Sequence, residues 1–324
     1  MALLLQKFAR FQKQTPPLRH DSQEELALSA SLQDFRSQIS KLVTQLGFSL
    51  GNPSPPNLSL SWINKCFGLL PAAHKAFANL AVDIDYPISK WSSDSIEGYL
   101  NYCLGLLQLF NVISSSLSHI GQSRLSLSFG LIKLKKSASS AKDHLKGIEI
   151  GSGKNHNKIT HNLEGGFSSG SEKSKDFSGK ERVLGEAISE LRSVGFWVCG
   201  IVLSAVAGDA GSYMEIRKKS CVFPGSRSVL LPLDSKIGEK LPVLKEVKEI
   251  NDAVGDLLAA SDSEDAAKDD AALELQKKVD SFQKGLDDLS KEVDDMFNKV
   301  MTQRNELIDC FRFRDRSPRK KSVA

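Results

Sequence analysis

Residues 58–87 have the sequence LSLSWINKCFGLLPAAHKAFANLAVDIDYP, and residues 97–125 have the sequence EGYLNYCLGLLQLFNVISSSLSHIGQSRL. In both stretches apolar residues recur every three or four positions, which is the spacing of one face of an α-helix. Between them, Tyr86-Pro87 ends the first helix, because proline cannot donate a backbone hydrogen bond and restricts the residue before it. The pattern predicts a helical scaffold, with helices over residues 58–81 and 92–120.

Heptad spacing appears on both sides of this centre. Upstream, after a candidate N-cap at Asp21 or Ser22, the apolar positions are Leu28, Leu32, Phe35, Ile39, Leu42 and Leu46, and Gly47 is expected to end the helix. Downstream they are Leu275, Val279, Phe282, Leu286, Leu289, Val293, Met296 and Val300. Spacings that alternate by four and three are typical of a coiled coil or a bundle helix. We therefore predict an all-α fold, an elongated helical bundle with long antiparallel helices.

Composition divides the chain into five parts. A basic N-terminal segment (1–20) precedes an N-terminal helical region (21–135). Residues 121–146 are expected to form a fourth helix, which runs past the end of this region. Residues 136–180 are rich in Ser, Gly, Lys and Asn and predict a disordered central insertion or linker. A C-terminal helical region (181–303) holds an apolar helix at 193–208, an irregular connection over 209–242 and the heptad helix 272–303. A disordered basic C-terminal tail (304–324) follows.

Charge is unevenly distributed, although the chain of 324 residues has a net charge of only +4. Residues 1–20 hold four basic residues and no acid, and residues 246–295 hold sixteen acids against six lysines. Leu4, Phe8 and Phe11 share one face of a basic helix, a pattern compatible with a transit peptide or a membrane-surface contact. The alternative is a terminal helix docked on the body of the protein. The five cysteines are widely spaced and odd in number, which predicts reduced, buried cysteines in a cytosolic protein.

The run SVGFWVCGIVLSAVAG, residues 193–208, is uncharged over its whole length. A spanning helix needs about 20 apolar residues, so the run is slightly short, and it contains two glycines. We expect a helix buried on all sides in the core; the alternative is a membrane anchor. The residues that would form this candidate membrane segment are Ser193, Phe196, Trp197, Ile201, Val202 and Leu203.

The C-terminal sequence FRFRDRSPRKK clusters positive charge with two phenylalanines. Such a cluster predicts binding of an anionic lipid surface, a nucleic acid or an acidic partner; the alternative is a solvated tail. The candidate anion-binding residues are Arg312, Arg314, Arg316, Arg319, Lys320 and Lys321. Ser317, followed by Pro318, is a candidate phosphorylation site, and phosphate there would weaken anion binding.

No catalytic, cofactor or metal site is predicted. Residues 166–170 match G-x-S-x-G by chance, because a nucleophile elbow needs a strand before the serine and none is expected there. His144, His156 and His161 lie in the predicted linker without a neighbouring cysteine, which does not favour zinc. No glycine-rich phosphate-binding loop is present.

Residues 58–134 resemble the plant BYPASS family. The matching residues are Leu60-Ser61-Trp62, His74, Leu80, the run Asp83-Ile84-Asp85-Tyr86-Pro87, Trp91, Tyr99-Leu100, Leu106-Leu107 and Phe110-Asn111. The resemblance implies helical proteins linked to root and shoot development, with relatives in the wider family linked to the exocyst tethering complex. It implies no catalytic residues.

Together these features predict a non-enzymatic plant regulatory or adaptor protein that needs no cofactor and binds a protein partner through helix faces. The resemblance suggests exocyst-type tethering factors as partners, and the basic ends suggest an anionic membrane surface. The heptad helix suggests a homo-oligomer, and nucleic-acid binding by the tail is the less favoured alternative. We expect a cytoplasmic protein in contact with membranes; the alternatives are a plastid protein and a single-pass membrane protein anchored by residues 193–208.

Overall fold

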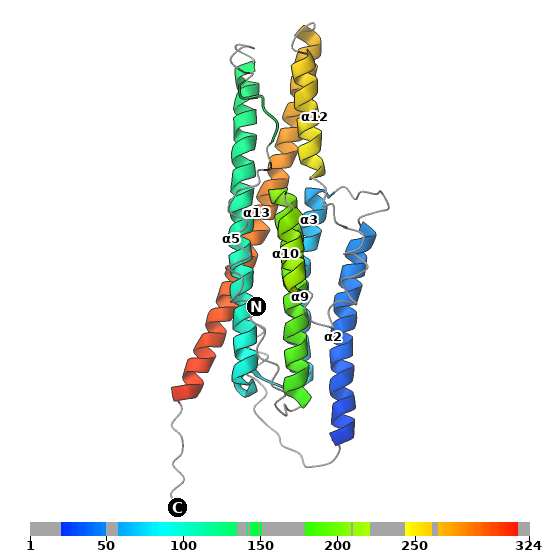
Figure 1. Ribbon diagram of the computed structural model, residues 1–324, viewed down its shortest axis with the longest axis vertical. Coiled ribbons are helices and arrows are strands. Elements are labelled where there is room, and N and C mark those ends of the chain that lie inside the picture. Colours follow the sequence, from blue (N-terminus) through cyan, green and yellow to red (C-terminus); the bar gives the residue numbers. More distant parts are fainter. Residues whose placement is uncertain are drawn as a thin grey trace, which may run out of the picture.

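The computed structural model describes residues 21–49, 58–134, 141, 143–148, 150, 179–208, 210–220, 244–260 and 265–316. Over these residues it is an elongated bundle of helices without a strand, as predicted (Figure 1). The helices are α2 (Asp21–Ser49), α3 (Leu60–Phe67), α4 (Leu69–Asp83), the 3₁₀ turn η1 (Ile88–Lys90), α5 (Ser93–Leu134), α9 (Gly179–Ala207), α10 (Ala210–Ser220), α12 (Lys245–Ala259) and α13 (Asp265–Arg316).

The helix predicted over residues 58–81 is two helices, α3 and α4, separated at Gly68. Ser59 caps α3, since its side chain accepts a hydrogen bond from the backbone N–H of Trp62 at 3.2 Å. The break has its cause in Pro71, which cannot donate to the carbonyl of Phe67 as a continuous helix would require.

Helix α5 is longer than predicted, because residues 121–134 continue the helix that begins at Ser93. Ser92 caps its first turn, with the N–H of Ser95 donating to the Ser92 hydroxyl oxygen at 3.1 Å. Leu117, Ile120, Leu127 and Leu131 keep the buried face apolar past Gly121, so nothing in the packing ends the helix there.

Helix α9 occupies the centre of the bundle, in contact with α2, α3, α4, α5 and α10. Its junction with α5 depends on two glycines. A Cβ atom on Gly105 would lie 2.6 Å from the Phe196 ring, and one on Gly195 would lie 2.9 Å from the Tyr102 ring. The two helices therefore approach more closely than any larger residue would allow.

After α9, Gly208 turns the chain with a φ of +64°, and α10 packs back along α9. Residues 209–242 were predicted to form an irregular connection, so α10 is a correction. Its helix lacks a long apolar pattern and is held by Tyr213 and Ile216, both 1% exposed. Residues 221–243 lie outside the described residues.

Helices α12 and α13 form an antiparallel hairpin, and α13 then runs antiparallel to α5 (Figure 1). All eight heptad positions from Leu275 to Val300 are buried, so this seam closes on its own chain. The predicted bounds 272–303 were too short. The helix extends into the predicted tail, where Leu307 is also buried.

The predicted linker is corrected at its start. Within 136–180, Ala141, Leu145 and Ile148 are buried in the core, and residues 179–180 belong to α9. The Ile148 backbone N–H donates to Asn251 Oδ1 at 2.7 Å, which ties this segment to α12. Helices from both predicted helical regions share one apolar core. Residues 151–178, and with them His156, His161 and the G-x-S-x-G match, lie outside the described residues.

Candidate functional site

The six residues of the candidate membrane segment lie in the core. Ser193, Phe196, Trp197, Ile201, Val202 and Leu203 belong to α9, and each is at most 3% exposed. By length and composition, α9 and α5 could each cross a membrane. The most apolar 18-residue window of α9 is wholly buried by the rest of the chain, whereas only half of the corresponding window of α5 is buried. Helix α5 therefore leaves uncharged surface uncovered.

A polar cluster around Glu181 joins the start of α9 to the start of α5. The Glu181 carboxylate accepts hydrogen bonds from the hydroxyls of Ser92 and Ser95, from the Ser92 backbone N–H at 3.3 Å, and from the Tyr86 hydroxyl at 2.6 Å. Burial alone would raise the pKa of Glu181, but these hydrogen bonds together hold that pKa below its ordinary value. The carboxylate also lies at the N-terminus of α5, where the helix dipole favours a negative charge.

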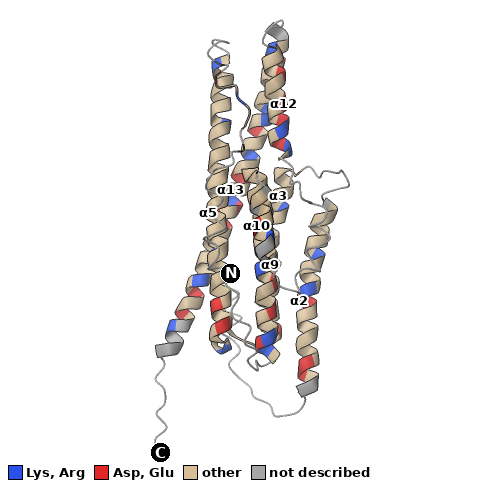
Figure 2. Ribbon diagram, in the orientation of Figure 1, with Lys and Arg blue, Asp and Glu red and all other residues tan. Residues whose placement is uncertain are grey.

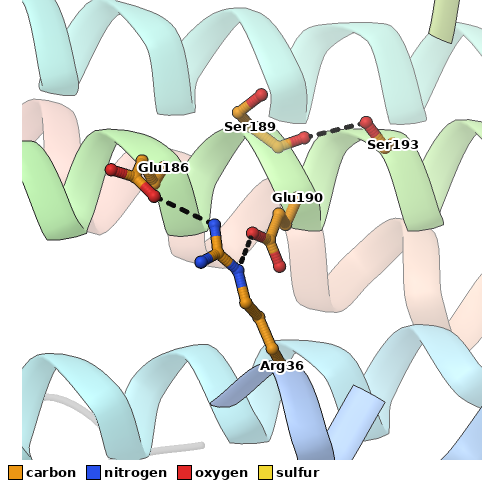
Figure 3. A network of polar contacts seen from close by, with 5 residues as sticks. All are labelled: Arg36, Glu186, Ser189, Glu190 and Ser193. Atoms are coloured by element: carbon orange, nitrogen blue, oxygen red, sulfur yellow. Dashed lines mark hydrogen bonds and ion pairs between the residues drawn. The ribbon is translucent and has the colours of Figure 1, made fainter. Parts of the chain in front are cut away.

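Arg36 of α2 clamps α9 (Figure 3). Its Nε donates to Glu190 Oε1 at 2.5 Å, and a terminal nitrogen donates to Glu186 Oε2 at 2.9 Å. Burial raises the pKa of Glu190, and the neighbouring Arg36 guanidinium opposes that shift. On the same helix, the Ser193 hydroxyl donates to the Ser189 carbonyl. Of the contacts drawn in Figure 3, those of Arg36 therefore join α2 to α9, and the Ser193–Ser189 bond lies within α9.

His74 and Tyr102 form a buried pair between α4 and α5. The His74 Nε2 and the Tyr102 hydroxyl oxygen lie 2.9 Å apart. Burial lowers the pKa of His74 to about 4, so its imidazole is neutral at physiological pH. The Tyr102 ring belongs to a cluster of aromatic side chains in stacked, edge-to-face and tilted contact. The members of this cluster are Phe77, Trp91, Tyr99, Tyr102 and Phe196. His74, Trp91 and Tyr99 of the BYPASS-like pattern therefore lie in this aromatic core.

The described cysteines are free thiols. Burial raises the pKa of Cys66, Cys103 and Cys199, and that of the Cys103 thiol reaches about 12, which disfavours the reactive thiolate. Cys310 is exposed, and Cys221 is outside the described part of the chain. Among the described residues no group of His, Cys, Asp and Glu could hold a metal ion.

The basic tail is described only in part. Arg312 is exposed on α13 and pairs with Asp309 at 3.8 Å. The backbone at Arg314 and Arg316 is helical. Ser317, Arg319, Lys320, Lys321 and the segment 1–20 lie outside the described residues.

The outer face of α5 carries a second seam, which we call the outer seam. Its positions alternate by four and three residues and are Leu104, Gln108, Asn111, Ser115, Ser118, Gln122, Leu125, Phe129 and Ile132. Eight of the nine are exposed and Gln108 is half-buried. None is charged, and from Gly98 to Leu134 the only charged residues of α5 are Arg124 and Lys133 (Figure 2). Such a stripe suits contact with another helix.

Three of these features were not predicted from the sequence. The Glu181 cluster and the Arg36 clamp join residues about 90 to 150 positions apart, and no local pattern signals them. The outer seam had a usable signal in the absence of acids over residues 98–134, which is unusual for a solvated helix face.

Comparison with known proteins finds plant relatives. Over 173 residues, 49% of this chain, it is 27% identical to UPF0496 protein 4 from Oryza sativa subsp. japonica, and an indica counterpart matches equally. Over 102 residues, 32% of this chain, it is 30% identical to Protein BPS1, chloroplastic, from Arabidopsis thaliana. The chain spans only 37% of the rice proteins and 27% of the Arabidopsis protein.

No family model matches the chain, and no solved structure matches it significantly. The similarity of this chain to known proteins therefore rests on these relatives, all three of which come from plants. The predicted resemblance to the BYPASS family is confirmed: over part of its length this chain is homologous to Protein BPS1 and to the rice UPF0496 proteins.

Proposed function

We propose that this chain is a non-enzymatic plant regulatory or adaptor protein that binds a partner helix along the outer seam of α5. The observation that carries the proposal is the seam itself, nine uncharged positions at heptad spacing on a helix whose other face is already buried. The setting, root and shoot development or signalling linked to membrane trafficking, comes from the BYPASS resemblance.

The buried polar groups support a structural rather than a catalytic role for the interior. Glu181, Arg36 and the His74–Tyr102 pair each join two helices, and His74 is neutral inside the aromatic core. The middle of the seam, with Asn111, Ser115, Ser118 and Gln122, offers small and amide side chains. These allow close approach and hydrogen bonding by a partner helix.

The test is affinity capture from plant cells with quantitative mass spectrometry. A Ser115→Glu/Ser118→Glu variant places two charges in the seam, and a Lys277→Glu/Lys291→Glu variant on the exposed face of α13 is the matched control. We expect the seam variant to lose the main partner and the control to keep it. Exocyst-type tethering factors among the lost proteins would extend the proposal to membrane trafficking. An unchanged set of captured proteins would contradict it.

Membrane association is proposed as peripheral, through the basic ends of the chain. The complete burial of the α9 window supports a core role for that helix over an anchor. Washing the membrane fraction of plant cells tests this directly. Release by high salt is expected, whereas retention through alkaline carbonate would make residues 193–208 an anchor. Recovery in chloroplasts would favour the plastid alternative, in line with the name of the Arabidopsis relative.

A further inference from the structure

Five exposed large apolar side chains gather at one end of the molecule. Leu125, Phe129 and Ile132 lie at the C-terminal end of α5, whereas Leu258 and Leu273 lie near the connection of α12 to α13. Figure 1 shows that these helix ends form the same end of the bundle. Three are more than half exposed: Leu125 at 57%, Ile132 at 59% and Leu273 at 55%. They form two groups, one on α5 and one on the α12–α13 hairpin, and exposed large apolar side chains that occur in groups are typical of an interaction surface.

The charges beside the two groups are opposite in sign. On α5, Arg124 and Lys133 flank the apolar residues, and the Lys133 ammonium lies 4.7 Å from the centre of the Phe129 ring. On α12 and α13, the exposed Asp256, Asp269 and Asp270 flank Leu258 and Leu273. We call the first group the basic patch and the second the acidic patch.

The two patches are held in a fixed relation. The segment 143–148 packs between the helices that carry them, with His144 against Gly130 of α5. At its other end, Asn251 of α12 accepts from the Ile148 N–H and donates to the Ile148 carbonyl at 3.3 Å. The segment adds one exposed acid and one exposed base, Asp143 and Lys146, which cancel. A preorganised surface loses less entropy on binding.

We propose that two copies of this chain pair at this end, the basic patch of each on the acidic patch of the other. Both patches present apolar side chains ringed by charge, and the charges are complementary. A twofold pairing uses both patches of both copies at once and closes the assembly at a dimer. An anionic lipid surface would suit the basic patch alone and would be repelled by the aspartates beside it. Leu125, Phe129 and Ile132 are also the last three positions of the outer seam, so pairing of two copies here leaves the seam from Leu104 to Gln122 for the proposed partner helix.

The test is light scattering of the purified full chain over a range of concentrations. We expect a concentration-dependent shift from 35.5 kDa to twice that mass. Lys133→Glu alone, or Asp269→Lys with Asp270→Lys, should raise the dissociation constant by at least about tenfold, because like charges then face each other. Lys291→Glu on α13, far from both patches, is the charge-matched control and should leave the dimer unchanged.

Charge exchange makes the test specific. The Lys133→Glu chain mixed with the Asp269→Lys/Asp270→Lys chain should pair more tightly than either variant alone, because opposite charges then face each other. The triple variant should also dimerise by itself for the same reason. Circular dichroism melts show whether each variant is folded. Ser115→Glu/Ser118→Glu should keep the dimer, so this inference and the outer-seam proposal fail separately. The proposal is overturned by a monomer at every concentration, by a dimer that ignores both charge changes, or by binding of the basic patch to phosphatidylserine vesicles without dimerisation.

Discussion

Helices α5 and α13 are the two longest helices described, and they pack antiparallel against each other, yet their outer faces differ. Helix α13 carries thirteen acids and ten basic residues over 52 positions, and α5 carries four charged residues over 42. Figure 2 shows the contrast directly. Both bury an apolar inner face, so folding explains the similarity between them. The uncharged outer face of α5 needs another explanation, and contact with a partner is the one proposed above.

The largest difference in stability is expected between a variant in the buried heptad seam of α13 and a variant in the outer seam of α5. Phe282→Ala empties a fully buried position of the α13 inner seam and should lower the free energy of unfolding by about 3–5 kcal/mol. Phe129→Ala removes a half-exposed ring from the α5 outer seam and should change it by less than about 1 kcal/mol. Urea denaturation followed by circular dichroism measures both. Equal losses would mean that the outer seam belongs to the core.

The close approach of α5 to α9 gives the next effect. Gly105→Ala places a methyl group 2.6 Å from the Phe196 ring and should destabilise the chain by about 1–3 kcal/mol. Gly121→Ala on the same helix meets nothing within 4 Å and should stabilise by about 0.5–1 kcal/mol. Thermal melts of the two variants should therefore shift in opposite directions. A melting temperature for Gly105→Ala that does not fall would show that α5 and α9 can separate without loss.

The Glu181 cluster should add a pH dependence of its own. Glu181→Gln keeps the shape but weakens the acceptor, which should reduce stability by about 1–3 kcal/mol at pH 7. The folded-state pKa of Glu181 is lowered, so its contribution is complete above the ordinary glutamate pKa and is lost as pH falls through the folded value. The gap between wild type and variant should therefore close in acid.

The matched control for that experiment is Glu25→Gln. Glu25 accepts from Arg182 at 3.1 Å on an exposed surface, where an ion pair contributes less than about 1 kcal/mol. Denaturation curves at a series of pH values should therefore separate the two carboxylates. A gap for Glu181→Gln that stays constant down to pH 2 would show that its hydrogen bonds do not depend on its charge.

The smallest change in stability is expected for substitutions on the exposed faces of α5 and α13. Ser118→Glu in the α5 outer seam should change the free energy of unfolding by less than about 0.5 kcal/mol, because the site is exposed. Lys291→Ser should behave in the same way on the exposed face of α13. If Ser118→Glu unfolded the chain, the absence of charge on α5 would be a demand of folding and not of binding.

The helical class and the inner faces were predictable because apolar spacing is a local signal. Phe35, Ile39 and Leu46 were assigned correctly, but Leu42 was chosen where Val43 is the more deeply buried, since a helix advances by 3.6 residues and not by 3.5. The break at Gly68 was missed although Pro71 announced it. Helix α10 was missed because its sequence has no long apolar pattern, and Tyr213 and Ile216 are its fully buried apolar residues among those described.

The candidate site was far less predictable. Residues 193–208 were expected in the core, and residues 193–207 lie there, whereas Gly208 is exposed. The outer seam could not be predicted, because the sequence does not say which of two helix faces is covered. Polar contacts such as Tyr86–Glu181 join residues 95 apart, and nothing near either residue indicates the other. Non-local polar pairs of this kind become visible only when the helices are placed together.

The central position of α9 has a consequence for synthesis on the ribosome. Helices α2 to α5 emerge first, and the apolar faces that they turn towards α9 have no cover until residue 207 has been made. At about 5–20 residues per second, the interval from residue 134 to residue 207 lasts roughly four to fifteen seconds. During that time the nascent chain presents Tyr102, Leu106 and the surrounding aromatic residues to the cytosol. A chaperone would bind the chain during this interval. A truncated transcript that ends before α9 would yield a product that aggregates, because its apolar faces stay uncovered.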